Sequence, residues 1–167
     1  ALVGRLVDII AGYVNAQIAA GAQVIQLFDS WIGALGPADY ESHILPHMQR
    51  LFRLISPGIP TVHFGTGTSG LLELLSAAGG DVIGVDWRID LSVAWKRIGG
   101  DRAVQGNLDP LVLFAPLGEL RAHVRRVLRE AGGRPGHIFN LGHGILPDTP
   151  VDNVVALVDM VHEYSQR

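Results

Sequence analysis

Residues 60–87 read PTVHFGTGTSGLLELLSAAGGDVIGVDW, which predicts a strand, a helix and a second strand in succession. The first strand is expected over 60–64, and a glycine-rich turn leads from it into a helix over 69–78. A pair of glycines ends that helix, and residues 81–85 (DVIGV) predict the next strand. Repeated units of this kind form a parallel sheet covered by helices.

The same alternation runs along the whole chain and predicts an α/β protein. Strands are expected over 23–28, 60–64, 81–85, 102–105 and 136–141. Helices are expected over 2–20, 37–55 with a break near Pro46, 69–78, 91–98, 118–131 and 153–161. Two architectures compete, a doubly wound open sheet and a (β/α)8 barrel, which usually needs about 250 residues. About five βα units in 167 residues, with a helix first, favour the C-terminal portion of a barrel. We therefore expect one partial barrel domain over 1–167, with its N-terminal units missing.

Composition narrows the functional classes. The chain is 48% hydrophobic and 17% charged, which is typical of a folded domain. A net charge of -3 argues against nucleic-acid binding, and the arginines of 118–131 are expected on a solvated helix face. The absence of cysteine excludes a disulfide or a thiolate metal site and fits a cytoplasmic protein. Charged residues interrupt the apolar runs, so no membrane span is expected.

The turn Gly65–Gly70 (GTGTSG) satisfies the G-x-G-x-x-G pattern of dinucleotide-binding proteins. It follows a strand and opens a helix, and Asp86 ends the next strand, where an acid would bind a ribose. This alternative predicts a nucleotide-binding α/β domain. Other strand ends carry equally polar residues, however, which favours a barrel that gathers its site from many strands.

His143 stands between two glycines in the segment 139–150, after the last predicted strand. The glycines allow a sharp turn and leave the imidazole accessible, so His143 is a candidate site residue, although a loop histidine that caps the next helix is the alternative. Ser30 follows the first strand and has no nucleophile motif around it, so we interpret it as a hydrogen-bond donor to a ligand. Asp109 is expected to cap the helical turn that Pro110 opens.

Several aromatic residues and histidines have two interpretations. His43 and His47 have the spacing of two metal ligands on a helix, but a surface pair is favoured because Pro46 lies between them and no glutamate completes a motif. His63 is expected as a satisfied core histidine, with a ligand contact as the alternative. Trp31 and Trp87 either wall a pocket or plug the end of the barrel.

Five motifs together resemble the uroporphyrinogen decarboxylase family in its bacterial form. In order along the chain they are QLFDSWIG (26–33), HFGTGT (63–68), DVIGVDW (81–87), VQGNLDP (104–110) and NLGHG (140–144). Nearly the whole chain is covered, and the dinucleotide-like turn is part of the family pattern. The resemblance is to the C-terminal half of such an enzyme.

The resemblance implies a (β/α)8 barrel, usually a homodimer, that acts in heme and related tetrapyrrole synthesis. The family removes the four acetate carboxyl groups of uroporphyrinogen to give coproporphyrinogen, without a metal or an organic cofactor. It implies that Ser30 hydrogen-bonds the substrate and that His143 orients it as the catalytic candidate. The turn with Gly65, Thr66 and Gly67 is implied to form part of the site wall.

The family's N-terminal arginine motif, essential aspartate and site tyrosine have no counterpart in these 167 residues. We therefore expect the chain to be inactive by itself. Three alternatives stay open: a barrel relative that transfers methyl groups with zinc and thiolate ligands, a nucleotide-binding half-domain, and a non-catalytic half-barrel that assembles with a partner chain. The lack of cysteine argues against the first.

Overall fold

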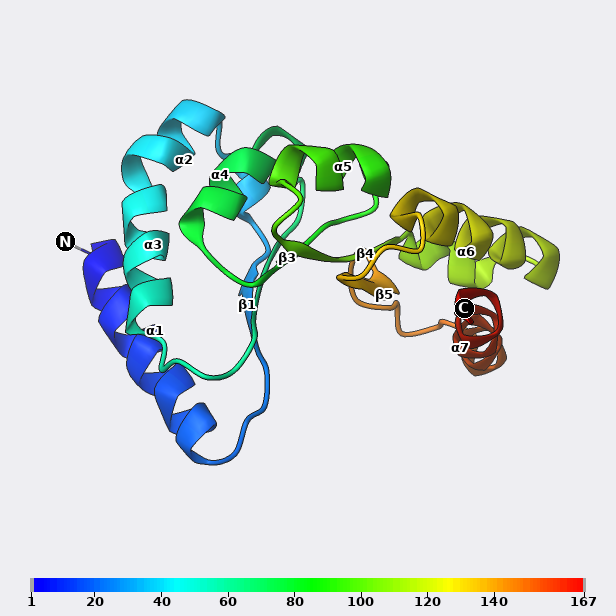
Figure 1. Ribbon diagram of the computed structural model, residues 1–167, viewed down its shortest axis with the longest axis horizontal. Coiled ribbons are helices and arrows are strands. Elements are labelled where there is room, and N and C mark those ends of the chain that lie inside the picture. Colours follow the sequence, from blue (N-terminus) through cyan, green and yellow to red (C-terminus); the bar gives the residue numbers. More distant parts are fainter. Residues whose placement is uncertain (1, 167) are drawn as a thin grey trace.

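The computed structural model describes residues 2–166, and the two end residues of the domain predicted over 1–167 lie outside that range. Its centre is a sheet of five strands, all parallel, in the order β1-β2-β3-β4-β5 (Figure 1). The strands are β1 (Ile25–Asp29), β2 (Thr61–Gly65), β3 (Val82–Gly84), β4 (Ala103–Leu108) and β5 (His137–Leu141). Each one lies close to its predicted position.

Seven α-helices connect and flank these strands in the described residues. They are α1 (Leu2–Ala19), α2 (Pro37–His43), α3 (Leu45–Leu54), α4 (Leu72–Ala78), α5 (Leu91–Ile98), α6 (Leu117–Ala131) and α7 (Val151–Ser165). The predicted break near Pro46 is confirmed, because α2 ends at His43 and Pro46 lies in the first turn of α3. Three short 3-10 turns, Ile32–Ala34, Thr68–Gly70 and Pro110–Phe114, follow β1, β2 and β4.

The strand order distinguishes between the two candidate architectures. Sequential parallel neighbours show no reversal of order, which a doubly wound sheet requires. The sheet is also strongly curved, because Gln105 Nε2 on β4 donates to Gln26 Oε1 on β1 at 3.3 Å. In a flat sheet, strands three positions apart lie about 14 Å apart. The fold is therefore part of a (β/α)8-type barrel, as predicted.

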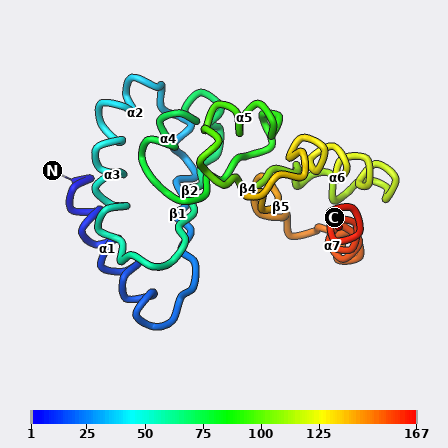
Figure 2. The backbone as a smooth tube through the Cα atoms, in the orientation of Figure 1, coloured from blue at the N-terminus to red at the C-terminus, as the bar shows by residue number. Residues whose placement is uncertain are grey.

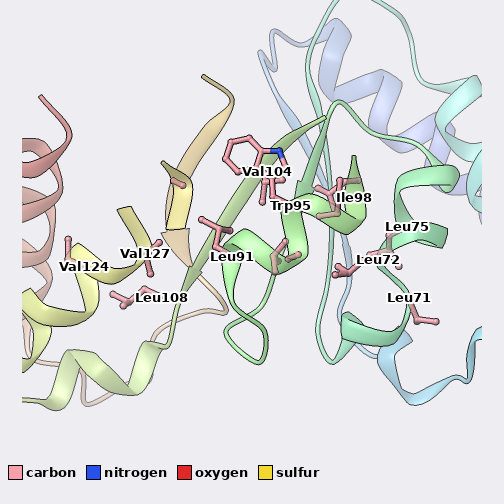
Figure 3. Packing of buried hydrophobic residues seen from close by; sticks show 14 of the residues in the cluster. Leu71, Leu72, Leu75, Leu91, Trp95, Ile98, Val104, Leu108, Val124 and Val127 are labelled. Atoms are coloured by element: carbon pink, nitrogen blue, oxygen red, sulfur yellow. The ribbon is translucent and has the colours of Figure 1, made fainter. Parts of the chain in front are cut away.

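The main apolar core lies between the convex face of the sheet and the helices. Ile83, Val104 and Leu108 of the sheet pack there against side chains of α4, α5 and α6. Figure 3 shows this layer, with Leu72 of α4 and Leu91 of α5 among its members. Burial of these side chains contributes about 1.5–3 kcal/mol each and fixes the strand ends that carry the loops.

The concave face and both edges of the sheet are open. Phe28 on β1 is 70% exposed and Ile138 on β5 is 45% exposed, although both occupy inner positions. Beside β1, an apolar groove of about 790 Å³ runs along α1. Helix α7 lies at the far end of the molecule from α1 (Figure 2). It exposes Val151, Val155 and Val158 at helical spacing. Large apolar surfaces at both edges are what half of a barrel would present.

β4 is longer than the sequence predicted. Its pairing with β5 continues through Gly106 to Leu108, whereas the predicted strand ends at residue 105. A Cβ on Gly106 would lie 2.5 Å from the carbonyl oxygen of Val85, the residue after β3, so glycine allows a close approach of β4 to that residue. The helix expected over 153–161 likewise begins earlier, at Val151, because Pro150 occupies its N-cap.

The expectation that no segment could span a membrane needs correction for α1. This helix is long and apolar enough to cross a membrane by length and composition, despite Arg5 and Asp8. Only 17% of this helix is buried, where Val7 and Ala11 pack against Leu51 of α3.

Candidate functional site

The predicted site residues lie in the loops at the carboxyl ends of successive strands. Ser30 follows β1, the turn Gly65–Gly70 follows β2, Trp87 follows β3 and His143 follows β5. In parallel barrels these ends share one face, and sites are built there. The structure therefore places all of them on the expected rim of the sheet.

The β1 and β2 ends are joined by backbone contact. Thr66 donates its hydroxyl to the carbonyl oxygen of Ser30. A Cβ on Gly33 would lie 2.2 Å from the carbonyl oxygen of Thr66, so only glycine allows the two loops to approach this closely. Ser30 is half-buried and its position is fixed by the neighbouring glycine-rich turn.

The turn that resembles a dinucleotide-binding loop is occupied by the protein's own carboxylate. Asp86 Oδ2 accepts the Gly67 N–H at 2.7 Å, and Asp86 is 1% exposed. The same oxygen accepts from Arg88 Nη1 at 2.6 Å. A ribose would need this acid to be accessible, so the geometry corrects the nucleotide-binding alternative. Asp86 positions the turn instead.

The β3 and β5 ends meet through aromatic contact. The rings of Trp87 and His143 lie edge to face, with their centroids 6.4 Å apart. The Arg88 guanidinium lies over the Trp87 ring, 4.0 Å from its centroid. Gly142 allows this approach, since a Cβ there would lie 2.5 Å from the Trp87 backbone nitrogen. His143 itself is exposed to solvent.

Asn107 on β4 stabilises the loop that follows β3. Its side-chain amide donates to the carbonyl oxygens of Asp86 and Ile89 at 2.9 and 2.6 Å. The buried Asn107 side chain therefore fixes the backbone of the loop that carries Trp87 and Arg88. Asp109 accepts the Leu111 N–H at 2.9 Å, which confirms its predicted capping role.

Ser30 and His143 do not contact each other. They belong to loops after β1 and β5, the two edge strands of the sheet. A chain of contacts connects the two residues indirectly. The glycine-rich turn bonds to both Ser30 and Asp86, and Trp87, which follows Asp86, contacts His143. The arrangement can therefore surround a large ligand from several sides.

Sequence reasoning missed the inner positions of β1. Gln26 and Phe28 point to the concave face, opposite to the helix-facing Leu27. Phe28 packs edge to face against Phe64 of β2, with ring centroids 5.8 Å apart. The two-residue alternation of a strand would have identified these positions once the strand boundaries were fixed.

The pKa values of two neighbouring groups, Asp29 at the end of β1 and Tyr40 of α2, are raised. Burial raises the pKa of Asp29. The pKa of Tyr40 is raised by burial and, secondly, by the negative charge of Asp29. The Tyr40 hydroxyl is fully buried, and it has no hydrogen-bond partner within residues 2–166.

The remaining candidates have structural positions. His43 ends α2 whereas His47 lies in α3, so the two are not on one continuous helix. In the part of the chain that the structure describes, no cluster of three potential ligands could hold a metal ion. Trp31 is 89% exposed, so it is not packed against the described residues as a plug. Its role as the wall of a pocket stays a prediction.

His63 lies in the core, as predicted, but without the expected partners. It packs on the Phe52 ring with the centroids 5.2 Å apart. Its two ring nitrogens form no well-formed hydrogen bond with the described residues. Burial lowers its pKa to about 4, and the nearby backbone at Leu75 and Gly79 acts weakly in the opposite direction.

A curved parallel βα sheet with polar loops on its carboxyl rim defines the class of (β/α)8-barrel proteins that bind ligands in these loops. Residues 1–164 match the model of the uroporphyrinogen decarboxylase family, described as "Uroporphyrinogen decarboxylase (URO-D)". The chain belongs to this family.

Curated relatives agree with the family assignment. The uroporphyrinogen decarboxylases of Solibacter usitatus and Sorangium cellulosum are each 56% identical to the chain, over 98% and 97% of its length. That of Carboxydothermus hydrogenoformans is 54% identical over 98%. The chain spans about half the length of these relatives, 48%, 47% and 47% respectively.

A solved structure, a methyltransferase from Methanosarcina mazei, shares the fold. It matches 96% of this chain and 48% of its own with a TM-score of 0.84, at 23% sequence identity. At this identity the likeness extends to the fold alone.

Proposed function

We propose that this chain supplies the C-terminal half of a barrel that decarboxylates the four acetate side chains of uroporphyrinogen III to give coproporphyrinogen III. Family membership over residues 1–164, with the family motifs gathered on one rim, is the observation that carries this proposal. The enzyme class is a carboxy-lyase, and the ligand is a small tetrapyrrole.

The chemistry requires an electron sink beside each acetate group. Protonation of a pyrrole carbon gives an iminium, and the bond to the carboxyl carbon then breaks as its electrons move toward the ring. Carbon dioxide leaves, a proton adds to the methylene carbon to complete the methyl group, and the ring proton is lost. The protein must exclude water, place an acid and hold the other carboxylates.

Residues of this chain have binding and orienting roles in the proposal. Ser30 donates a hydrogen bond to the substrate, and His143 orients the ring or a side-chain carboxylate. Gly65, Thr66 and Gly67 form a wall whose position Asp86 sets. The half-exposed and exposed positions of Ser30 and His143 on the rim support these roles.

No metal or organic cofactor enters the proposal. The alternative, methyl transfer with zinc and thiolate ligands, lacks support because the chain has no cysteine to contribute. Chelators are expected to leave turnover unchanged, and inhibition by a chelator that added zinc reverses would favour the alternative.

The proposal extends to the cellular setting of the enzyme. A cytoplasmic homodimer in heme and tetrapyrrole synthesis is proposed from the family resemblance, with no nucleic-acid or membrane partner. Sedimentation of the assembled enzyme tests the dimer, and a single monomeric species at working concentration would contradict it.

The test uses a hybrid barrel, in which the N-terminal half of the Solibacter usitatus relative precedes this chain. We expect the hybrid barrel to convert uroporphyrinogen III to coproporphyrinogen III and the 167-residue chain alone to be inactive. The lone chain leaves both edges of its sheet open and cannot exclude water from the concave face. A folded hybrid barrel without turnover would contradict the proposed function, and robust turnover by the chain alone would contradict the need for a second half.

A further inference from the structure

Arg88 is the only arginine or lysine in the loops at the carboxyl ends of the five strands. These loops, which run from each strand to the next α-helix, cover residues 30–36, 66–71, 85–90, 109–116 and 142–150. Every other lysine or arginine of the described residues lies outside them. A permanent positive charge on this rim is therefore confined to one residue.

The Arg88 side chain is held in a fixed position but stays half exposed. Its backbone N–H donates to Asp86 Oδ1 at 3.1 Å, and its Nη1 donates to Asp86 Oδ2 at 2.6 Å. Its guanidinium stacks over Trp87 at 4.0 Å. The Arg88 side chain is 49% exposed, whereas that of Asp86 is 1% exposed. Within residues 2–166 its guanidinium makes no hydrogen bond besides the one to Asp86.

This geometry leaves N–H groups of the Arg88 guanidinium available to a ligand. A guanidinium carries five N–H donors in a planar fork, which matches the two oxygens of a carboxylate. The bond to Asp86 and the stacking on Trp87 orient the fork before any ligand arrives, which reduces the ordering cost of binding. Asp86 already neutralises part of the positive charge of Arg88. We therefore expect Arg88 to bind a carboxylate through the fixed orientation of its N–H donors more than through its net charge.

Arg88 shares a neighbour, Trp87, with the candidate site residue His143. Trp87 contacts both the Arg88 guanidinium and the His143 ring, so the two polar groups flank one indole. We propose that Arg88 binds a peripheral carboxylate of the tetrapyrrole substrate, beside the Trp87 indole that His143 also contacts. This inference rests on the proposed function for the identity of the ligand.

The test measures binding and turnover in the hybrid barrel. Uroporphyrin III, the oxidised octacarboxylate, serves as the binding probe through quenching of tryptophan fluorescence. Arg88→Lys keeps the charge but loses the fork, and we expect its Kd for uroporphyrin and its KM for uroporphyrinogen to rise about 10-fold or more. The value of kcat is expected to change less than twofold.

Arg50→Lys is the matched control. Arg50 of α3 is 43% exposed on its side chain and pairs with Asp8 of α1, on the outer helical layer. Its substitution is expected to leave Kd, KM and kcat within twofold of the unsubstituted hybrid barrel. A similar change in both variants would show a general effect of replacing an arginine by lysine and overturn the proposal.

A second variant separates the loss of the ligand site from the loss of the Asp86–Arg88 ion pair. Arg88→Gln leaves the Asp86 carboxylate buried without its cation, which can prevent folding. The double variant Asp86→Asn, Arg88→Gln removes both charges and is expected to raise Kd at least as much as Arg88→Lys. Unchanged Kd in Arg88→Lys and in a folded double variant would overturn the proposal, as would a loss confined to kcat and thermal stability.

Failure of the proposed function gives a different result. A hybrid barrel that binds uroporphyrin in an Arg88-dependent manner without turnover would contradict the decarboxylase role and support the carboxylate site. Turnover with kinetics and binding independent of Arg88 would support the decarboxylase role and overturn the inference about Arg88.

Discussion

The Asp86 carboxylate accepts the backbone N–H of Gly67 at 2.7 Å, so the end of β3 fixes the glycine-rich turn that follows β2. An acid at this sequence distance from G-x-G-x-x-G normally serves a bound ribose. Here the acid is 1% exposed and bound to the turn itself. The same pattern of residues thus builds a rigid wall in place of a nucleotide site.

Replacement of Asp86 by asparagine is expected to destabilise the hybrid barrel by about 1–3 kcal/mol. The asparagine amide removes the charge that pairs with Arg88 and weakens the bond to Gly67. Urea unfolding gives the change in the free energy of unfolding. Asp90→Asn is the control, since its side chain is 63% exposed and its ion pair with Arg126 is long, at 3.6 Å. Equal effects of the two substitutions would contradict the structural role of Asp86.

Gly33→Ala is expected to displace the turn after β2. The added Cβ would lie 2.2 Å from the Thr66 carbonyl oxygen and 2.6 Å from that of Gly67, both of which are backbone atoms. We expect a loss of stability above about 2 kcal/mol and a fall in turnover, because overpacking forces backbone shifts. Gly36→Ala meets no atom within 4 Å and is the control. Wild-type melting temperature in Gly33→Ala would show that the two loops do not approach as described.

Stability is expected to depend on pH through His63. Its pKa is lowered to about 4 in the folded protein, against the ordinary value of 6.5. Between these values the unfolded chain binds more protons, so stability falls as the pH drops from 6.5 toward 4, by about 3 kcal/mol in total. His63→Leu should flatten this dependence in urea unfolding, whereas His43→Leu, at an exposed position, should not. An unchanged pH dependence in His63→Leu would contradict the burial of a neutral ring.

The sequence predicted the βα alternation because each strand is a short apolar run bounded by glycine or aspartate. The strand order and the curvature followed only from the structure, since the Gln26–Gln105 hydrogen bond joins residues 79 positions apart. The end of β4 was misplaced because Gly106 has the sequence appearance of a turn, whereas it serves close approach to Val85.

The sequence predicts the loops of the candidate site one by one. It does not predict the hydrogen bonds and ring contacts that connect these loops. The positions of Ser30 and His143 after strands predict them as site residues. Asp86 enters the prediction only as the ribose ligand of the nucleotide-binding alternative, because a sequence pattern gives no information on burial. Arg88 carried no motif of its own. Its significance depends on the absence of other cations from the five loops, which requires the loop boundaries to be known.

The central claim, that the carboxyl rim of this half-barrel is the site of decarboxylation, is tested most directly by His143→Ala in the hybrid barrel. We expect kcat/KM for uroporphyrinogen III to fall about 10-fold or more, because an orienting group is lost at an exposed position where folding is not affected. His43→Ala, an exposed histidine at the end of α2, should leave kcat/KM unchanged. Unchanged kinetics in His143→Ala would remove this residue from the site and contradict the account.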